Sequence, residues 1–199
     1  MNERRERNKD KTVQDILYAA KELFSERGLN GTSFRDIEDA SGVSKGLILH
    51  HFGSKENLYA AVQDLLIDEY VSMMAEQRKV GENLHEEIAA AVRNSFMHTK
   101  KNRAYRRISL WSYLEGQERN AELEERFTKA LINAMRDGQA NGMVREDIDA
   151  FLMPFIIKGT IEYWIRKDKL LRGLLKNEKE QKGDLDDQLM DALTRLFMK

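Results

Sequence analysis

Apolar residues recur every three or four positions through most of this chain, the spacing that places them on one face of an α-helix. The first such stripe stops at Gly28. Because glycine ends helices readily, the pattern predicts one amphipathic helix before it. The stripe comprises Val13, Ile16, Leu17, Ala20, Leu23 and Phe24.

Two short helices are predicted next, over residues 34–40 and 45–51. Ser33 precedes the first and Ser44 the second, so each has a hydroxyl that can cap its first amide groups. Gly42, between them, can adopt the positive φ of a tight turn. Two short helices joined by a glycine turn and preceded by a longer helix predict a helix-turn-helix.

Longer helical patterns fill the rest of the chain, and they predict an all-α fold with two domains, residues 1–54 and residues 55–199. A charged stretch from Gly173 to Gly183 is interpreted as a mobile connection. The predicted helices cover residues 55–77, 84–99, 104–115, 121–140, 148–167 and 185–197.

The composition of the chain excludes several classes of protein. The 199 residues include no cysteine, which excludes disulfides, thiolate nucleophiles and cysteine zinc sites and fits a reducing compartment. The charged N-terminus has no apolar segment like that of a secretory signal, and the apolar run from Phe151 to Ile157 is interrupted by Pro154 and too short to span a bilayer. We therefore expect a cytoplasmic protein without membrane association.

The charge balance alone does not predict nucleic-acid binding, because the net charge is −1. The placement of charges is more informative: no acidic residue occurs from Ala40 to Lys55, a stretch that holds two lysines and the pair His50 and His51. The field near the predicted turn is therefore positive.

An ordered set of residues around the turn resembles the DNA-binding domain of the TetR family. It runs from Thr32-Ser33-Phe34-Arg35-Asp36-Ile37, through Ser41-Gly42-Val43-Ser44-Lys45-Gly46, to Phe52-Gly53-Ser54-Lys55-Glu56-Asn57-Leu58. The preceding helix, with Ile16-Leu17, Ala19-Ala20, Leu23-Phe24 and Gly28, resembles the first helix of that family.

The resemblance implies a homodimer that binds double-stranded operator DNA through the second short helix, placed in the major groove. The residues expected to face base edges are Lys45, Gly46, Leu47 and His50. The residues expected to contact phosphates are Thr32, Ser33, Arg35, His51 and Lys55, and the segment from Arg4 to Lys11 can add contacts.

Two positions depart from the family pattern: Leu49 stands where a tyrosine is usual, and Glu38 where an alanine is usual. We expect them to alter DNA affinity or specificity. His50 and His51 point about 100° apart on a helix and have no third ligand nearby, so no metal site is predicted.

The helix predicted over residues 104–115 carries apolar residues on most sides and is expected at the centre of the larger domain. Methionines and aromatic residues on this and other helices suit either a core or a ligand cavity. The resemblance favours a cavity for a small organic effector, apolar or amphipathic, with no cofactor. The expected pocket residues are Tyr70, Met73, Met74, Phe96, Met97, His98, Arg107, Trp111, Glu115, Phe155, Glu162 and Tyr163.

The last two predicted helices carry apolar and small residues that suit an isologous four-helix interface. The alternative is that the terminal helix covers only the core of its own chain. The expected interface residues are Ile156, Thr160, Leu185, Leu189, Leu193 and Leu196.

These observations favour a sequence-specific transcriptional regulator, most commonly in this family a repressor that an effector releases from a palindromic operator. The helix from Lys55 onward links the two predicted sites and is expected to transmit the effect. Two alternatives stay open. An enzyme is disfavoured, because the chain has no GxSxG, no glycine-rich phosphate loop and no second histidine after His85-Glu86-Glu87. A helical scaffold that lacks specific DNA binding fits Leu49 and Glu38.

Overall fold

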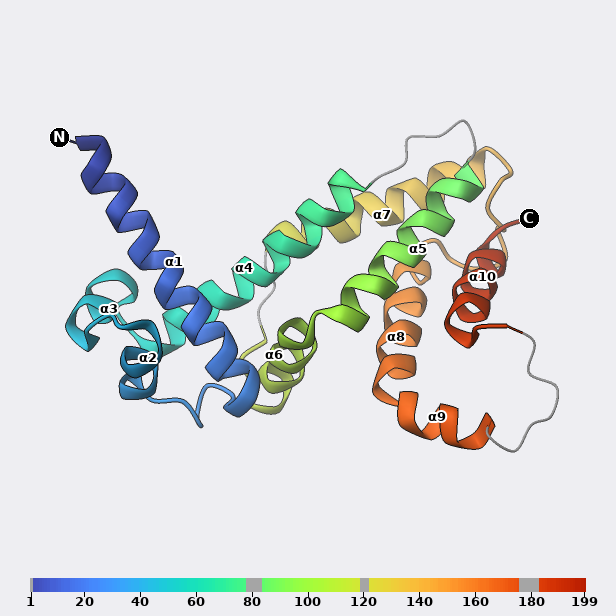
Figure 1. The fold of residues 1–199 in the computed structure, drawn as a ribbon. Helices are drawn as coiled ribbons and strands as arrows, with labels where there is room; N and C mark the ends of the chain where they lie inside the picture. The colour runs from blue at the N-terminus through green and yellow to red at the C-terminus, as the bar shows by residue number, and fades with distance from the viewer. Residues whose placement is uncertain (1, 78–83, 119–121, 176–182) are drawn as a thin grey trace. The chain divides into compact units, whose positions relative to one another are not determined.

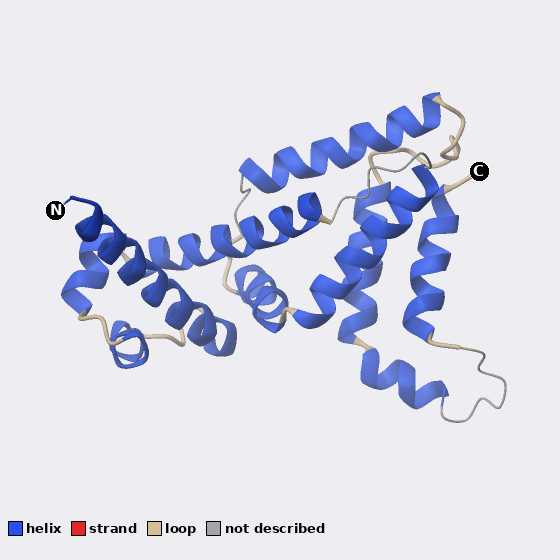
Figure 2. Ribbon diagram, turned by 45° about the horizontal axis from the view of Figure 1, so that its top comes forward, coloured by secondary structure: helices blue, strands red, loops and turns tan. Residues whose placement is uncertain are grey.

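The computed structural model describes residues 2–77, 84–118, 122–175 and 183–199, and over these ranges all regular structure is helical (Figures 1 and 2). This confirms the predicted all-α fold. The helices are α1 (Asn2–Arg27), α2 (Phe34–Ser41), α3 (Lys45–Phe52), α4 (Lys55–Glu76), α5 (Leu84–Lys101), α6 (Arg103–Leu114), α7 (Glu122–Ala140), α8 (Met153–Arg166), α9 (Asp168–Leu175) and α10 (Leu185–Phe197).

The largest differences from the expected helices are two helix starts and one additional helix. Helix α1 begins at Asn2, well before the apolar stripe, because nothing in the charged segment stops a helix there. Helix α8 begins at Met153 instead of residue 148, with Pro154 in its first turn, where its missing N–H costs no helical hydrogen bond. Helix α9 was not predicted, and of the expected connection from Gly173 to Gly183, residues 176–182 lie outside the described residues.

The chain divides into two compact units. The first unit joins residues 1–69 with residues 102–121, and the second joins residues 70–101 with residues 122–199. This division differs from the one expected at residue 54, since the first unit also contains the start of α4 and all of α6. The two units are described separately below.

The first unit has a continuous apolar core between α1, α2, α3, α4 and α6. Phe24 and Tyr59 meet edge to face, with ring centroids 4.9 Å apart, at its centre. Burial of these side chains fixes how the two short helices pack against α1. The buried members of the core are Ile16, Ala20, Phe24, Leu29, Ile37, Ile48, Leu58, Tyr59, Val62, Leu66 and Ile108.

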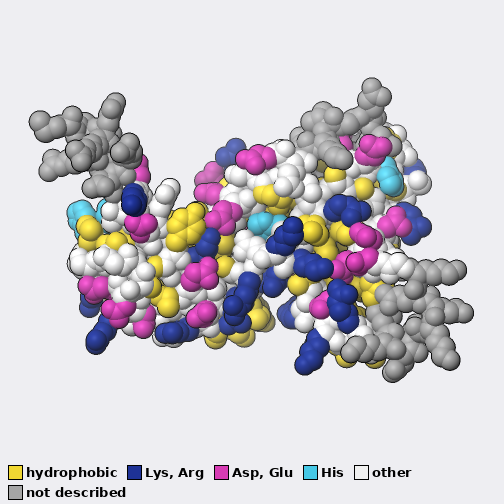
Figure 3. Space-filling view, in the orientation of Figure 1, with side chains coloured by type: hydrophobic (Ala, Val, Ile, Leu, Met, Phe, Trp, Pro, Cys, Tyr) yellow, Lys and Arg dark blue, Asp and Glu magenta, His cyan; other side chains and the backbone are white. Residues whose placement is uncertain are grey.

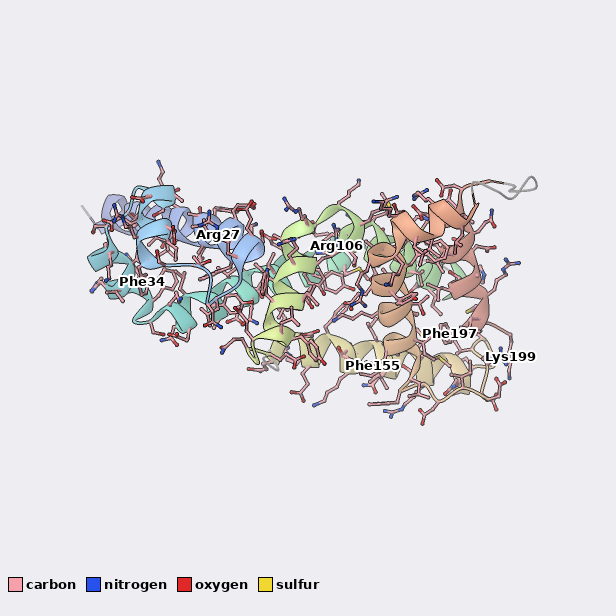
Figure 4. The ribbon with its side chains drawn as sticks, turned by 90° about the horizontal axis from the view of Figure 1, so that it is seen from below. Arg27, Phe34, Arg106, Phe155, Phe197 and Lys199 are labelled. Atoms are coloured by element: carbon pink, nitrogen blue, oxygen red, sulfur yellow. The ribbon has the colours of Figure 1, made fainter. Side chains whose placement is uncertain are left out.

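In the second unit, α5 packs against α8 and α10. Near the end of the chain, Met198 forms an isolated antiparallel bridge with Val144. The residues on either side of Met198, Phe197 and Lys199, are labelled in Figure 4. The buried members of this core are Ile88, Val92, Phe96, Met135, Val144, Ala150, Met153, Ile161, Met190, Leu193 and Phe197.

Within the described ranges, every helix is too short or too polar to cross a membrane.

Candidate nucleic-acid interface

Helices α2 and α3 are defined by hydrogen bonds local in sequence. Ser33 and Asp36 form a reciprocal capping box at the start of α2, and the Ser44 hydroxyl accepts from the amide of Leu47 at the start of α3. Gly42 ends α2 with φ of 69°, a left-handed conformation that other residues adopt at a cost. The turn between the two helices therefore follows directly from residue types.

Helix α3 has one buried and one exposed side. Ile48 is fully buried in the core of the first unit, and Leu49 is half-buried. Leu47 is 40% exposed. All four residues expected to read bases, Lys45, Gly46, Leu47 and His50, lie on the exposed side.

The residues expected to contact phosphates fall into two groups. Ser33 and Arg35 are exposed and His51 is half-buried. Thr32 is different, because its side chain is buried and its hydroxyl donates to the carbonyl of Gly28, 2.8 Å away. The expected phosphate contact of the Thr32 side chain is therefore corrected to a role inside the turn.

Lys55 stands at the start of α4, and its Nζ donates to the carbonyl oxygen of Thr32 at 2.7 Å. An ammonium group has two further N–H bonds, so this contact orients Lys55 without exhausting its donors. Lys55 thus connects α4 to the turn that leads into α2.

Asp36, one of the three acidic residues of α2, is held by local hydrogen bonds. The hydroxyl of Ser33 and then its backbone N–H bond the Asp36 carboxylate and lower its pKa below the ordinary value. Asp36 thus stays ionised while its charge serves the helix N-terminus. Elsewhere, acidic and basic side chains are intermixed on the face seen in Figure 3, so net charge does not mark the interface.

Helix α6 and its C-cap contribute three residues that were expected in a ligand pocket, and all three contact the end of α1 or the turn that follows it, within the first unit. Glu115 accepts from the amides of Leu29 and Asn30, at 2.8 and 3.1 Å. Arg107 donates to the carbonyls of Ser25 and Glu26. Trp111 lies so close to Gly28 that a Cβ on the glycine would be 2.9 Å from its ring.

The pocket expectation for Arg107, Trp111 and Glu115 is accordingly corrected to a structural role in the first unit. The expectation that residues 104–115 form a helix buried on most sides at the centre of the larger domain is wrong: α6 belongs to the first unit and buries Ile108 and Ser112, whereas Leu110, Tyr113 and Leu114 are exposed. Hydrogen bonds across more than eighty residues leave no periodic signal.

In the second unit, polar and aromatic side chains gather around Tyr70. Its hydroxyl donates to Ser95 Oγ at 3.2 Å, and its ring meets His98 and Phe127 edge to face at 5.1 and 5.7 Å between centroids. Burial raises the pKa of Tyr70, and the charges of Lys158, Glu124 and Glu162 also act on it. We call Tyr70, Ser95, His98 and Phe127 the Tyr70 cluster.

The other residues expected in the pocket differ from one another in solvent exposure. Met74 and Phe96 are buried, whereas Met73 and Glu162 are partly buried. Three are more exposed on the second unit: Met97, Phe155 and Tyr163. Phe155, labelled in Figure 4, is 50% exposed and Tyr163 56% exposed, so neither is walled in by its own chain.

Of the residues expected at a dimer interface, Leu193 is buried in the core of its own unit, which removes it from any outer surface. Leu196 is 40% exposed. The remaining four, Ile156, Thr160, Leu185 and Leu189, are partly buried. Prediction from the stripe alone could not separate the inner from the outer positions of α10.

Phe127 and Ser95 were not predicted as site residues. Phe127 belongs to the apolar face of α7, and Ser95 is a small polar residue of α5 that follows Arg93 and Asn94. Only the packing of α4, α5 and α7 brings them to Tyr70. The polar residues before Ser95 give no sign in the sequence that it is buried.

Comparison with known proteins gives the same picture for the N-terminal region. Residues 16–62 match the pattern of bacterial regulatory proteins of the tetR family. The repressor AcnR of Corynebacterium glutamicum is 49% identical over 49 residues, which are 25% of this chain and 26% of AcnR. The chain thus matches about a quarter of that relative's length.

Similarity extends further in other proteins. The repressor KstR2 of Rhodococcus jostii is 28% identical over 145 residues, covering 69% of this chain and 70% of KstR2. Among solved structures, AibR in complex with isovaleryl coenzyme A and operator DNA has a TM-score of 0.68 at 19% identity, covering 94% of this chain and 98% of AibR. The fold is therefore shared along nearly the whole chain.

Proposed function

This chain belongs to the tetR family of bacterial regulatory proteins, and from that premise we propose that it is a transcriptional regulator that binds operator DNA through α3. The observation that carries the proposal is the exposed side of α3, where Lys45, Leu47 and His50 face solvent in a region without acidic residues. Ile48, on the opposite side of α3, is fully buried and anchors the helix in the core of the first unit.

The chemistry of that side suits a major groove. Lys45 can donate to guanine O6 and N7, and Leu47 can contact a thymine methyl group. Arg35 and Lys55 flank the helix with donors for phosphate oxygens, and such contacts set the register on DNA, whereas the Ser33 hydroxyl already donates to Asp36. Leu47 is 40% exposed in the free protein, and a base edge would cover it in the complex with DNA.

The proposal is tested by recovering genomic fragments on the purified protein and titrating the best fragment against salt. Lys45→Ala combined with His50→Ala should weaken binding by tenfold or more, as loss of base contacts worth about 1–3 kcal/mol each would do. Lys169→Ala, a matched loss of an exposed lysine in the second unit, should leave binding unchanged. Recovery of no selective fragment would reject the proposal in favour of a scaffold that lacks specific DNA binding.

We infer that the effector binds at the Tyr70 cluster. Its support is the convergence of a hydroxyl pair, an imidazole and two aromatic rings from α4, α5 and α7, a mixture of apolar wall and few polar groups typical of ligand sites. AibR is a structural neighbour solved with an acyl thioester ligand, so a small organic molecule with an apolar part and a polar group is the class proposed here.

Tyr70→Phe tests the site, because it keeps the ring and removes the hydroxyl that bonds Ser95. Once an effector is found by its release of the operator fragment, this variant should bind it about tenfold more weakly, while its operator affinity without effector stays the same. Tyr18→Phe, an exposed tyrosine of the first unit, is the control. Equal effector affinity in Tyr70→Phe and the wild type would place the effector elsewhere.

The dimer is proposed to form through the exposed side of α8. Leu152, Phe155 and Tyr163 are each about half exposed and follow one helical stripe with Gly159, and Leu196 of α10 is exposed too. Apolar side chains this exposed on one stripe commonly mark an interface. Phe155→Glu should shift the sedimenting species to a monomer, and Tyr113→Glu on α6 should not; a dimer that survives Phe155→Glu would exclude this surface.

A further inference from the structure

The contacts between α6 and the end of α1 form a clamp whose parts are Arg107, Trp111 and Glu115. Glu115 is its centre, because one carboxylate accepts from two consecutive backbone amides, those of Leu29 and Asn30. Backbone N–H groups that donate to a carboxylate form charge-assisted hydrogen bonds, which are stronger than bonds between neutral groups. These amides follow α1 at a turn, where helix-type hydrogen bonds are no longer available to them.

Gly28 leaves the space that the Glu115 carboxylate occupies. Its φ of 71° reverses the chain after α1, and a Cβ at this position would lie 2.7 Å from Glu115 Oε1. Arg107 bonds the last carbonyls of α1 at Ser25 and Glu26, where a cation also suits the helix dipole. The clamp therefore fixes both the carbonyl end of α1 and the amides of the turn that follows.

The other end of the same turn leads directly into the proposed DNA-contacting elements. Thr32 donates from its hydroxyl to the Gly28 carbonyl, and Lys55 donates to the Thr32 carbonyl. Ser33, the next residue, caps α2. Only three residues, 31–33, thus separate Asn30, which Glu115 holds, from the start of α2; Arg27 and Phe34, labelled in Figure 4, are the residues before and after this turn.

Helix α6 is also bonded to α4. The Tyr59 hydroxyl lies 3.1 Å from Ser112 Oγ, and Gln63 Nε2 donates to the same oxygen at 2.8 Å. Because α6 is joined in this way to α1, to the turn and to α4, it has little freedom to shift within the first unit without moving the turn.

We propose that α6 is a working part of the nucleic-acid-binding unit and that Glu115 is a positioning residue, which holds the turn from Gly28 to Thr32 so that α2 and α3 meet DNA in register. The inference rests on the proposed function of α3 for its DNA arm. Base contacts tolerate only a few tenths of an ångström in donor–acceptor distance, so a displaced turn weakens them together.

The test uses the full-length protein with Glu115→Gln, which keeps the shape of the side chain and replaces one acceptor oxygen by a donor that faces an N–H. Glu118→Gln, the same change at an exposed position just beyond α6, is the matched control. Two quantities are measured: hydrogen exchange of the amides in α2, and the dissociation constant for the recovered DNA fragment.

Glu115→Gln is expected to speed exchange about tenfold in α2 as well as at Leu29 and Asn30, and to weaken DNA binding about tenfold, while Glu118→Gln changes neither. Faster exchange that stops at Thr32, or unchanged DNA affinity despite faster exchange in α2, would overturn the inference. Should Glu115→Gln not fold, Glu115→Asp, which keeps the charge but shortens the reach, is expected to give the same pattern with smaller factors.

The exchange arm separates this inference from the proposed function. If the wild-type protein recovers no DNA fragment, the proposed function fails, yet faster exchange in α2 would still support the clamp. If the wild type binds DNA and Glu115→Gln binds it equally well, the function stands and the positioning role of Glu115 is excluded.

Discussion

Glu115 in the first unit and Asp186 in the second each join helices far apart in the sequence, but their surroundings differ. Glu115 accepts from neutral backbone amides of a turn. Asp186 accepts from Lys100 Nζ, from Trp164 Nε1 at 2.9 Å and from Arg172 at 3.3 Å, joining α10 to α5, α8 and α9. One carboxylate organises a turn, and the other balances charge between helices.

The difference predicts different kinds of failure. Without Glu115, two neutral amides lose a charge-assisted acceptor, and the effect is confined to the turn and the helices that follow it. Without the Asp186 charge, Lys100 and Arg172 each lose an ionic contact to a largely buried side chain, of which 9% is exposed, while Arg172 keeps its pair with Asp168. Burial raises the pKa of Asp186, but hydrogen bonds from Lys100 and Trp164 and the charges of Lys100 and Arg172 outweigh it and leave the pKa below its ordinary value.

The largest effect is expected from Gly28→Ala. The methyl group would meet both Glu115 Oε1 and the Trp111 ring inside 3 Å, and the residue would keep a positive φ. Crowding and strain together should lower the free energy of unfolding by about 2–4 kcal/mol in denaturant titrations. Gly142→Ala, with φ of 72° and open space around it, should cost about 1 kcal/mol; equal losses would mean that the clamp is not tightly packed.

Asp186→Asn is expected to come next. It keeps the size of the side chain and removes the charge that faces Lys100 and Arg172, both about half exposed, so the loss in unfolding free energy should be about 2 kcal/mol and not the larger value of a fully buried pair. Thermal and urea unfolding would measure it. An unchanged stability would show that solvent already screens this site.

The contribution of Asp186 should also depend on pH. Because its pKa is lowered in the folded protein, its stabilising effect is complete above the ordinary value of 3.8 and is lost as the pH falls through the lower, folded value. The stability difference between wild type and Asp186→Asn should therefore be constant near neutral pH and shrink below about pH 4. A difference that instead grew on acidification would contradict the assignment.

The smallest effect is expected at the ion pair beside it. Arg93 and Asp187 also join α5 to α10, at 2.9 Å, but their side chains are 57% and 62% exposed. Exposed pairs contribute little because water and salt screen them, so Asp187→Asn should change the unfolding free energy by less than about 0.5 kcal/mol. A loss as large as that of Asp186→Asn would mean that helix pairing and not burial decides the energy.

Much of the fold was predictable because it depends on local pattern. Helices α2, α3, α4 and α10 begin at the predicted residues, where a cap or a glycine precedes an apolar stripe. Helix α9 was missed because its eight residues stand beside a charged stretch that resembles a connection. A short amphipathic segment carries too little periodicity to outweigh such composition.

In the candidate site, too, the features that depend on local sequence pattern were predictable and those that depend on distant partners were not. The exposed residues of α3 follow from spacing around Ile48, but the inward hydroxyl of Thr32 and the grip of Glu115 depend on partners that only folding brings together. Residues 104–115 show the limit best, since their apolar pattern predicted burial on most sides, whereas α6 is buried only in part and against helices that the pattern could not identify.

The most direct test of the central claim compares hydrogen exchange in α2 between Glu115→Gln and Asp186→Asn. If Glu115 positions the nucleic-acid-binding helices from within their own unit, exchange over Phe34–Ser41 should quicken in Glu115→Gln and stay at the wild-type rate in Asp186→Asn. Equal acceleration in both variants, or none in Glu115→Gln, would contradict the account.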